Sequence, residues 1–115
     1  GTLKNLKLFN MPNADSNHVL LRNNISSKEA RRQKVIVTHE IVMLLGDNLS
    51  DFSILFDKKP ANERMRNTNF SASDFGSRFI VFPNTVYGDW ESVLYNYNKY
   101  TLVQKDSVMR SVLKP

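Results

Sequence analysis

The sequence predicts an α/β domain in which a parallel sheet of about three strands carries helices on both faces. The apolar runs at residues 41–45 and 78–82 are continuous rather than alternating, which is typical of strands buried on both faces. Segments with helical periodicity separate these runs, and that order favours parallel pairing. Because sheets of this class usually have five or six strands, the sequence indicates that the sheet is incomplete.

The first third of the chain is expected to form two helices with a short strand between them. Apolar residues recur three positions apart over residues 2–9, which predicts a short helix. The apolar run at residues 18–22 has the length of a strand. A second helix is expected to begin in residues 26–34, where Ser26 and Glu29 have the spacing of a capping box.

The rest of the chain continues the alternation. The β-branched residues 35–37 leave the end of the second helix open, because they could also form a strand by themselves. In order, we expect a strand at 41–45, a helix around 52–56, a helix that begins near Pro60, a strand from 78 into the loop 83–90, a helix at 90–97 and a closing helix over 102–113.

Composition narrows the possible functions. The net charge of +5 lies entirely in residues 1–34, which hold seven Lys/Arg and two Asp/Glu. We interpret this excess as a solvated helix face rather than a nucleic-acid surface, because only Phe9 supplies an aromatic ring there. No apolar run approaches the ~18 residues of a membrane helix. The absence of cysteine excludes disulfides and thiolate metal sites.

Two aspartates follow the strand at 41–45, at the sheet edge where ligands of parallel sheets bind. Asp47 comes directly after the strand, and Asp51 lies four residues later. Two close carboxylates repel each other unless a cation lies between them, and Mg²⁺ prefers such oxygen ligands. Alternatively, Asp47 caps the following helix, helped by Asn48 or Ser50. Spacing alone leaves both interpretations open.

Two longer motifs carry a family resemblance. The segments "LLGDNLSDFS" and "FGSRFIVFPNTVYGDWESVLYNY" resemble the C-terminal half of the class C acid phosphatases. These proteins are also described as lipoprotein e(P4)-type 5′-nucleotidases of the haloacid dehalogenase superfamily. The resemblance runs nearly from Thr2 to the C-terminus. It implies a three-layer haloacid-dehalogenase-like fold in which residues 1–115 are the C-terminal half and the half with the nucleophile motif is absent.

The resemblance also implies roles for five residues. Asp47 would coordinate Mg²⁺ directly, while Asp51 would bind a metal-ligated water or hold a lysine in place. That lysine is Lys28, whose ammonium would neutralise phosphoryl charge and pair with Asp51. Tyr87 would stack on the organic part of the substrate, and Asn84, its polar neighbour, would also contact the substrate. Alternatively, Tyr87 packs its loop onto the core.

Other prominent side chains receive structural interpretations. Arg31 and Arg32 are expected on the surface, and Trp90 is expected to pack its loop onto the core. His18 and His39 have no partner at useful spacing and match no motif of the family, so both are interpreted as structural or exposed.

The nucleophile of the family has no counterpart in this sequence. Members use an aspartate that forms an aspartyl-phosphate, with a second aspartate two residues later as general acid and base. None of the seven aspartates here is followed by another at that spacing. We therefore expect no activity from this chain alone and weak or absent Mg²⁺ binding. A piece of a cleaved or partly represented enzyme, a truncation and a short self-associating product all remain open.

The resemblance implies Mg²⁺-dependent hydrolysis of phosphomonoesters, with nucleoside monophosphates as one substrate class. The alternative is a non-catalytic binding or assembly module that retains the fold. The strand at 41–45 is expected to expose an edge that pairs with the missing N-terminal half or with a second copy. Family members are exported lipoproteins or secreted proteins, so the resemblance implies a location in the cell envelope or outside the cell.

Overall fold

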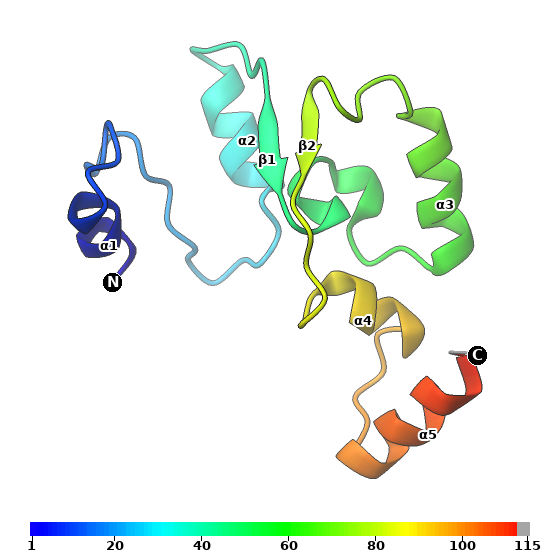
Figure 1. Ribbon diagram of the computed structural model, residues 1–115. Helices are drawn as coiled ribbons and strands as arrows, with labels where there is room; N and C mark the ends of the chain where they lie inside the picture. Colours follow the sequence, from blue (N-terminus) through cyan, green and yellow to red (C-terminus); the bar gives the residue numbers. More distant parts are fainter. Residues whose placement is uncertain (113–115) are drawn as a thin grey trace.

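A short parallel sheet lies at the centre of the chain, and helices follow each strand (Figure 1). The computed structural model describes residues 1–112, so Leu113, expected in the closing helix, lies outside the described residues. In order, the elements are α1 (Thr2–Leu8), α2 (Glu29–Ile36), β1 (Leu44–Gly46), the 3-10 helices η1 (Leu49–Asp51) and η2 (Ile54–Phe56), α3 (Ala61–Phe70), β2 (Phe79–Val81), α4 (Asp89–Leu94) and α5 (Leu102–Val112).

The two strands pair in parallel, as the sequence predicts. Leu44 lies opposite Phe79 and Gly46 lies opposite Val81. The connection between them runs through η1, η2 and α3. Because parallel strands end at the same edge of a sheet, the segments that follow Gly46 and Val81 start side by side. The α/β class of the prediction is confirmed, with an incomplete sheet.

The expected third strand at residues 18–22 is wrong. These residues lie in the irregular connection between α1 and α2, apart from the sheet (Figure 1). A strand needs a neighbour that takes its backbone hydrogen bonds, and this run has none in the described part of the chain. The strand expected at 41–45 is also shorter than expected, because pairing begins only at Leu44.

The helices follow the predicted order with shifted ends. Val35 and Ile36 belong to α2, so these β-branched residues extend the helix and do not form a strand. The helix expected around residues 52–56 is only the short 3-10 turn η2, and a second such turn, η1, precedes it. The helix expected at residues 90–97 ends earlier, at Leu94. None of the helices in residues 1–112 is both long enough and apolar enough to cross a membrane.

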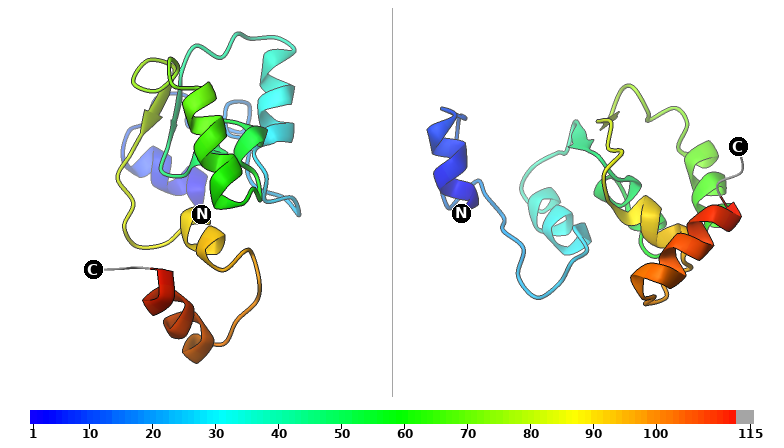
Figure 2. Two further views of the ribbon diagram at one scale, coloured as in Figure 1. Left: turned by 90° about the vertical axis from the view of Figure 1, so that its right-hand side faces the viewer. Right: turned by 60° about the horizontal axis from the view of Figure 1, so that its bottom comes forward.

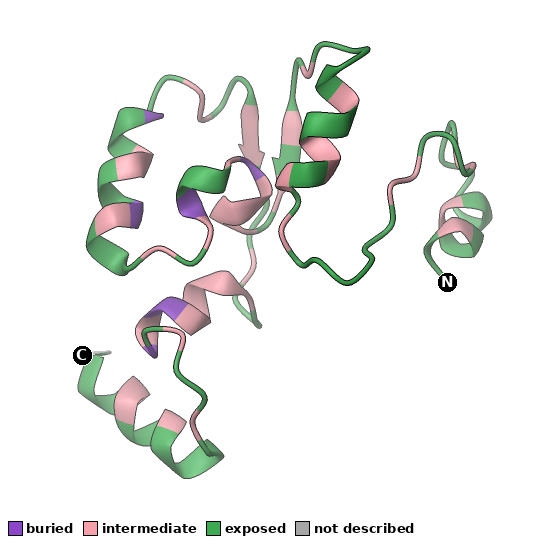
Figure 3. Cartoon of the chain, turned by 180° about the vertical axis from the view of Figure 1, so that it is seen from behind, coloured by how far each residue is buried: buried purple, intermediate pink, exposed green. Residues whose placement is uncertain are grey.

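A small apolar core lies beneath the segment that follows β1. Phe56 is completely buried, and Phe52, Val93 and Tyr95 are nearly so (Figure 3). The Phe52 ring stacks on the Phe79 ring of β2 with 5.1 Å between centroids. Offset aromatic pairs of this kind add to the stabilisation that comes from buried area. The core therefore fixes η1 and η2 against the sheet at the end where the two strands terminate.

Much apolar surface remains open around the sheet. The accessible surface is 9151 Å², whereas a closed monomer of 13.3 kDa is expected to expose about 6,500 Å². The radius of gyration is 16.6 Å against about 13 Å for a compact domain of this length. Helices α1 and α5 lie at opposite ends, away from the sheet (Figure 2). The strand at β1, expected to be buried, leaves Leu45 57% exposed.

Candidate functional site

An open cavity of about 490 Å³ lies where β1 and β2 end. Four of the five residues with expected roles line this cavity: Lys28, Asp47, Asp51 and Tyr87. The fifth, Asn84, is not in the lining but donates a hydrogen bond to Asp47. The lining of the cavity consists of Ser26, Ser27, Lys28, Asp47, Asn48, Ser50, Asp51, Asp57, Lys58, Tyr87, Asp89 and Ser92. Residues from three distant segments therefore meet at the sheet edge, as expected for a ligand site of a parallel sheet.

Asp51 joins Lys28 to the turn after β1. One carboxylate oxygen, Oδ1, lies 2.6 Å from the Lys28 ammonium, and the Asp51 side chain is only 9% exposed. The other oxygen, Oδ2, accepts the backbone N–H groups of Asp47 at 3.1 Å and Asn48 at 3.2 Å. Asn48 is the N-cap of η1 and forms a capping box with Asp51. The interpretation of Asp47 as the helix cap is therefore wrong, because its neighbour has that role.

Lys28 is held at the start of α2 by its neighbour Ser27. The Ser27 hydroxyl donates to Asp57 at 2.5 Å and accepts the N–H of Glu29 at 3.2 Å. The capping box expected from Ser26 and Glu29 is therefore wrong: the helix begins at Glu29 with Lys28 as its N-cap, two residues later than that box requires, and the hydroxyl that accepts the Glu29 N–H is that of Ser27. The Lys28 side chain remains 51% exposed, and its ammonium has donors left for a ligand in the cavity.

Gly46 is required because Asp51 approaches the strand closely. A Cβ at position 46 would lie closer than 3.0 Å to Asp51 Cβ and Oδ2, a separation that real Cβ atoms essentially never show. We expect Gly46→Ala to displace Asp51 and to lower the free energy of unfolding by about 1–3 kcal/mol, as overpacking does. Urea unfolding followed by circular dichroism measures this. Gly1→Ala is the control, since nothing lies within 4 Å there; equal midpoints for both variants would contradict the close approach.

Asp47 is the exposed carboxylate of the site. Its Oδ1 accepts Asn48 Nδ2 at 2.9 Å, and its Oδ2 accepts Asn84 Nδ2 at 2.6 Å. Burial raises the pKa of the Asp47 carboxyl, but the hydrogen bonds from Asn48 and Asn84 outweigh it and hold the pKa below the usual 3.8. Asp47 is therefore an anion throughout the neutral range.

The two carboxylates of the site differ in what they leave open to a metal ion. Within residues 1–112 no group of three or more acidic or histidine side chains could hold a metal. Asp51 is occupied by the Lys28 ammonium and two backbone N–H groups. Mg²⁺ often takes only one or two carboxylates, with waters and substrate phosphate as further ligands. Asp47 suits that role, whereas the contacts of Asp51 suit the alternative of holding the lysine.

Tyr87 lies in the loop after β2 with its side chain turned to solvent. The residue is 70% exposed, so it does not pack the loop onto the core. The loop is shaped by Asn84, whose Oδ1 accepts the N–H groups of Val86 at 3.1 Å and Tyr87 at 3.4 Å. Asn84 is thus a neighbour of Tyr87 through the backbone, and its amide nitrogen reaches Asp47 instead.

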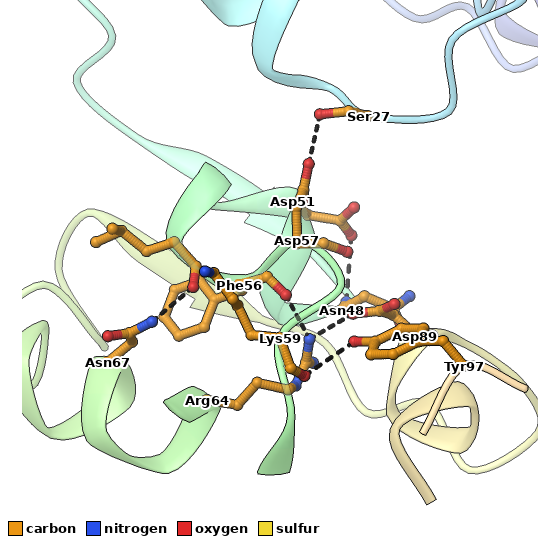
Figure 4. A network of polar contacts seen from close by, with 12 residues as sticks. Ser27, Asn48, Asp51, Phe56, Asp57, Lys59, Arg64, Asn67, Asp89 and Tyr97 are labelled. Atoms are coloured by element: carbon orange, nitrogen blue, oxygen red, sulfur yellow. Dashed lines mark hydrogen bonds and ion pairs between the residues drawn. The ribbon is translucent and has the colours of Figure 1, made fainter. Parts of the chain in front are cut away.

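A buried polar network behind the cavity was not anticipated from the sequence. The guanidinium of Arg64 forms an ion pair with Asp89 and donates to the Phe56 carbonyl at 2.7 Å (Figure 4). Arg64 is only 6% exposed. Asp89 in turn donates its N–H to Asn48 Oδ1 at 2.9 Å. Nothing in the sequence distinguishes Arg64 from the exposed Arg66 of the same helix, because the partner of Arg64 lies 25 positions away.

The expectation that Arg32 is a surface residue is wrong. Its side chain is 11% exposed and pairs with Glu29 at 2.7 Å. It also donates to the carbonyl of Asp51 at 2.8 Å. Glu29, three positions before it on the helix, is the one sequence signal that could have indicated an ordered arginine. Arg32 therefore ties α2 to η1 directly beneath the Lys28–Asp51 pair.

The remaining side chains with structural interpretations agree in part. His18 is exposed but, contrary to expectation, has a partner: its ring lies 2.8 Å from Asp15 Oδ1. His39 is exposed, and its ring nitrogen Nδ1 lies 2.8 Å from the Thr38 hydroxyl. Trp90 is half-buried, and within the described residues its Nε1 is buried without a hydrogen-bond partner. Arg31 is half-buried rather than fully exposed.

Comparison with known proteins assigns this fold and site to a family. A sequence model described as HAD superfamily, subfamily IIIB (acid phosphatase), matches residues 1–90. A structure of the class C acid phosphatase from Bacillus anthracis superposes on this chain with a TM-score of 0.93. The match covers 99% of this chain, and the sequence identity is 44%. A second structure of that enzyme, with tungstate bound, gives the same values. The chain belongs to the subfamily IIIB acid phosphatases of the HAD superfamily.

The family that the two sequence motifs resemble is thereby confirmed. The chain spans 48% of the length of the two B. anthracis structures. The described residues form a sheet of two strands, which agrees with the incomplete sheet expected from the sequence.

Proposed function

We propose that this chain contributes the cation-ligating and substrate-facing part of a Mg²⁺-dependent phosphatase that hydrolyses phosphomonoesters through an aspartyl-phosphate. The Lys28–Asp51 ion pair, which faces the same cavity as Asp47, is the observation that carries this proposal. Family membership supports the acid phosphatase class. The metal, the intermediate and the substrate class are the parts that we propose.

Lys28 acts on the phosphoryl group. Its ammonium is fixed on one side by Asp51 and exposed on the other. An ammonium held in this way requires no reorganisation when negative charge develops on the phosphoryl oxygens, and such preorganised donors stabilise transition states strongly. Asp51 thus orients the donor without contacting the substrate.

Asp47 binds the cation. The hydrogen bonds from Asn48 and Asn84 keep it ionised and oriented. When bound, the magnesium ion supplies positive charge beside the phosphoryl oxygens. The nucleophile is an aspartate outside this sequence: its carboxylate attacks phosphorus, the ester bond to the leaving alcohol breaks, and that oxygen takes a proton from the second aspartate. Water then attacks the aspartyl-phosphate, gives its proton to the second aspartate and releases inorganic phosphate.

Tyr87 forms the wall for the organic part of the substrate. Its exposed ring borders the same cavity as Lys28 and Asp47. A planar base of a nucleoside monophosphate stacks on such a ring with about 1–3 kcal/mol per base. We therefore infer that esters with an aromatic or nucleoside group are better substrates than those with small alkyl groups.

The complementary half of the domain is the partner that completes the site. The surface in excess of a closed monomer is about 2,700 Å², which exceeds a standard protein interface. Val42, Met43 and Leu45 around β1 are 48–73% exposed, and in the described part of the chain β1 pairs only with β2. Without that partner, we expect the free edge to pair with a second copy.

Reconstitution tests the proposal. The chain is co-expressed with the part of the B. anthracis enzyme that lies outside the matched segment, and hydrolysis of p-nitrophenyl phosphate is measured. We expect no turnover from the chain alone, turnover from the complex with Mg²⁺, and its loss after chelation by EDTA. Turnover by the chain alone, or turnover that does not respond to EDTA, would contradict the proposal.

A non-catalytic binding or assembly module is the second candidate. The absence of any Asp-x-Asp pair from the sequence favours it. A complex that forms stoichiometrically in size-exclusion chromatography, yet neither binds Mg²⁺ nor turns over substrate, would support this candidate instead.

A further inference from the structure

Two asparagine amides hold the Asp47 carboxylate, one at each oxygen. Asn84 Nδ2 donates to Oδ2 at 2.6 Å, and Asn48 Nδ2 donates to Oδ1 at 2.9 Å. The two asparagines come from different segments, one directly after β1 and one after β2. The plane of the carboxylate is therefore defined by both strands together.

The orientation of each amide is fixed by its own carbonyl oxygen. Asn84 Oδ1 accepts the backbone N–H of Val86 at 3.1 Å and of Tyr87 at 3.4 Å. Asn48 Oδ1 accepts the backbone N–H of Asp89 at 2.9 Å. Because a backbone N–H requires an acceptor, the oxygen must face the loop and the nitrogen must face Asp47. A flip of either amide would lose both the hydrogen bond to the Asp47 carboxylate and the hydrogen bond from the loop backbone.

The loop that carries Tyr87 is thus fastened to the Asp47–Asn48 pair at both ends. Asn84 ties its beginning, and the Asp89 N–H ties its end (Figure 4 shows Asn48 and Asp89). Gly88 allows the second attachment, because a Cβ at this position would overlap Asn48 Oδ1. Tyr87 lies between the two attachments, so its position depends on the same contacts that orient the carboxylate.

We propose that Asn84 is a positioning residue that couples the cation-binding carboxylate to the substrate wall. This inference rests on the proposed function, since it assigns Asp47 to the cation and Tyr87 to the organic group. It replaces the expectation that Asn84 contacts substrate. Losing Asn84 disturbs two properties of the site that would otherwise be independent: the affinity for Mg²⁺ and the preference for a large leaving group.

The test uses Asn84→Leu, which keeps the shape of the side chain and removes both polar atoms. It is made in the complex with the complementary half of the B. anthracis enzyme. Mg²⁺ affinity is measured by titration calorimetry without substrate. Leaving-group preference is the ratio of kcat/KM for adenosine monophosphate to that for glycerol phosphate, two alkyl esters. We expect Mg²⁺ affinity to fall about 10–100-fold, as for other groups that orient metal ligands, and the ratio to fall at least fivefold.

Two control variants separate coupling from other causes. Tyr87→Ala should lower the ratio and leave the Mg²⁺ affinity unchanged. Asn67→Leu removes a hydrogen bond of equal length, to the Leu55 carbonyl at 2.6 Å, and should change neither quantity. If Asn84→Leu changes only the ratio or only the affinity, or if Asn67→Leu matches it, the coupling is refuted. A wild-type complex without turnover would instead refute the proposed function. Calorimetry separates the two failures, because the Mg²⁺ affinity can be measured without turnover.

Discussion

Asp47→Asn, made in the complex of this chain with the complementary half of the domain, is expected to remove nearly all Mg²⁺-dependent phosphatase activity. The substitution keeps the size of the side chain and removes the charge that attracts the cation. It also replaces one accepting oxygen with an NH2 group, so only one of the hydrogen bonds from Asn48 and Asn84 can remain. A metal that neutralises phosphoryl oxygens stabilises the transition state by several kcal/mol. A loss of about 4 kcal/mol corresponds to a fall in kcat/KM of roughly 10³-fold.

The measurement is the rate of p-nitrophenyl phosphate hydrolysis as a function of Mg²⁺ concentration. Asp106→Asn is the matched control, because that exposed aspartate lies on α5 and pairs with Arg110 of the same helix. The control should retain the wild-type rate. If Asp47→Asn retained more than a tenth of that rate at the same Mg²⁺ concentration, Asp47 would not be the carboxylate that binds the cation.

Arg64→Met is expected to have the largest effect on stability. The substitution leaves the Asp89 carboxylate and the Phe56 carbonyl without their buried donor. A group left without its donor costs about 1–3 kcal/mol. Asp89 is 22% exposed, so water compensates its charge in part, and we expect the carbonyl and the carboxylate together to cost about 2–4 kcal/mol. We expect the free energy of unfolding, measured by urea denaturation of the complex, to fall by that amount.

A double-mutant cycle shows whether the ion pair itself is responsible. Arg66→Met on the same helix is the control, since Arg66 is exposed, and it should change the unfolding midpoint little. Asp89→Asn combined with Arg64→Met should cost less than the sum of the single substitutions, with a coupling energy of about 0.5–3 kcal/mol. Strictly additive effects would show that the two side chains do not stabilise each other.

Local patterns in the sequence predicted what depends on neighbours along the chain. The continuous apolar runs before Asp47 and before Asn84 predicted two parallel strands that end at one edge. The spacing of Asp47 and Asp51 placed both at that edge. The pairing of Lys28 with Asp51 came from the family resemblance, because nothing in the spacing of these two residues requires it.

The same local patterns failed where an element needs a distant partner. Residues 18–22 are as apolar as a strand, but hydrophobicity supplies no neighbour for their backbone hydrogen bonds. Arg32 and Arg64 look like solvated helix residues, but each donates to carbonyl groups of the turns after β1. Their partners are close only after the chain has folded across the sheet.

The sequence by itself therefore determined the fold class, the sheet edge that carries the site and the identity of the acidic and basic groups there. Only the tertiary structure showed that Asp51 is engaged by Lys28 and by the backbone, which leaves Asp47 as the carboxylate that we propose for the cation. It also decided that Asn84 reaches Asp47 across 37 positions. Side-chain periodicity reports only on residues within a turn or two, whereas such contacts are set by strand pairing and by the path of the loops.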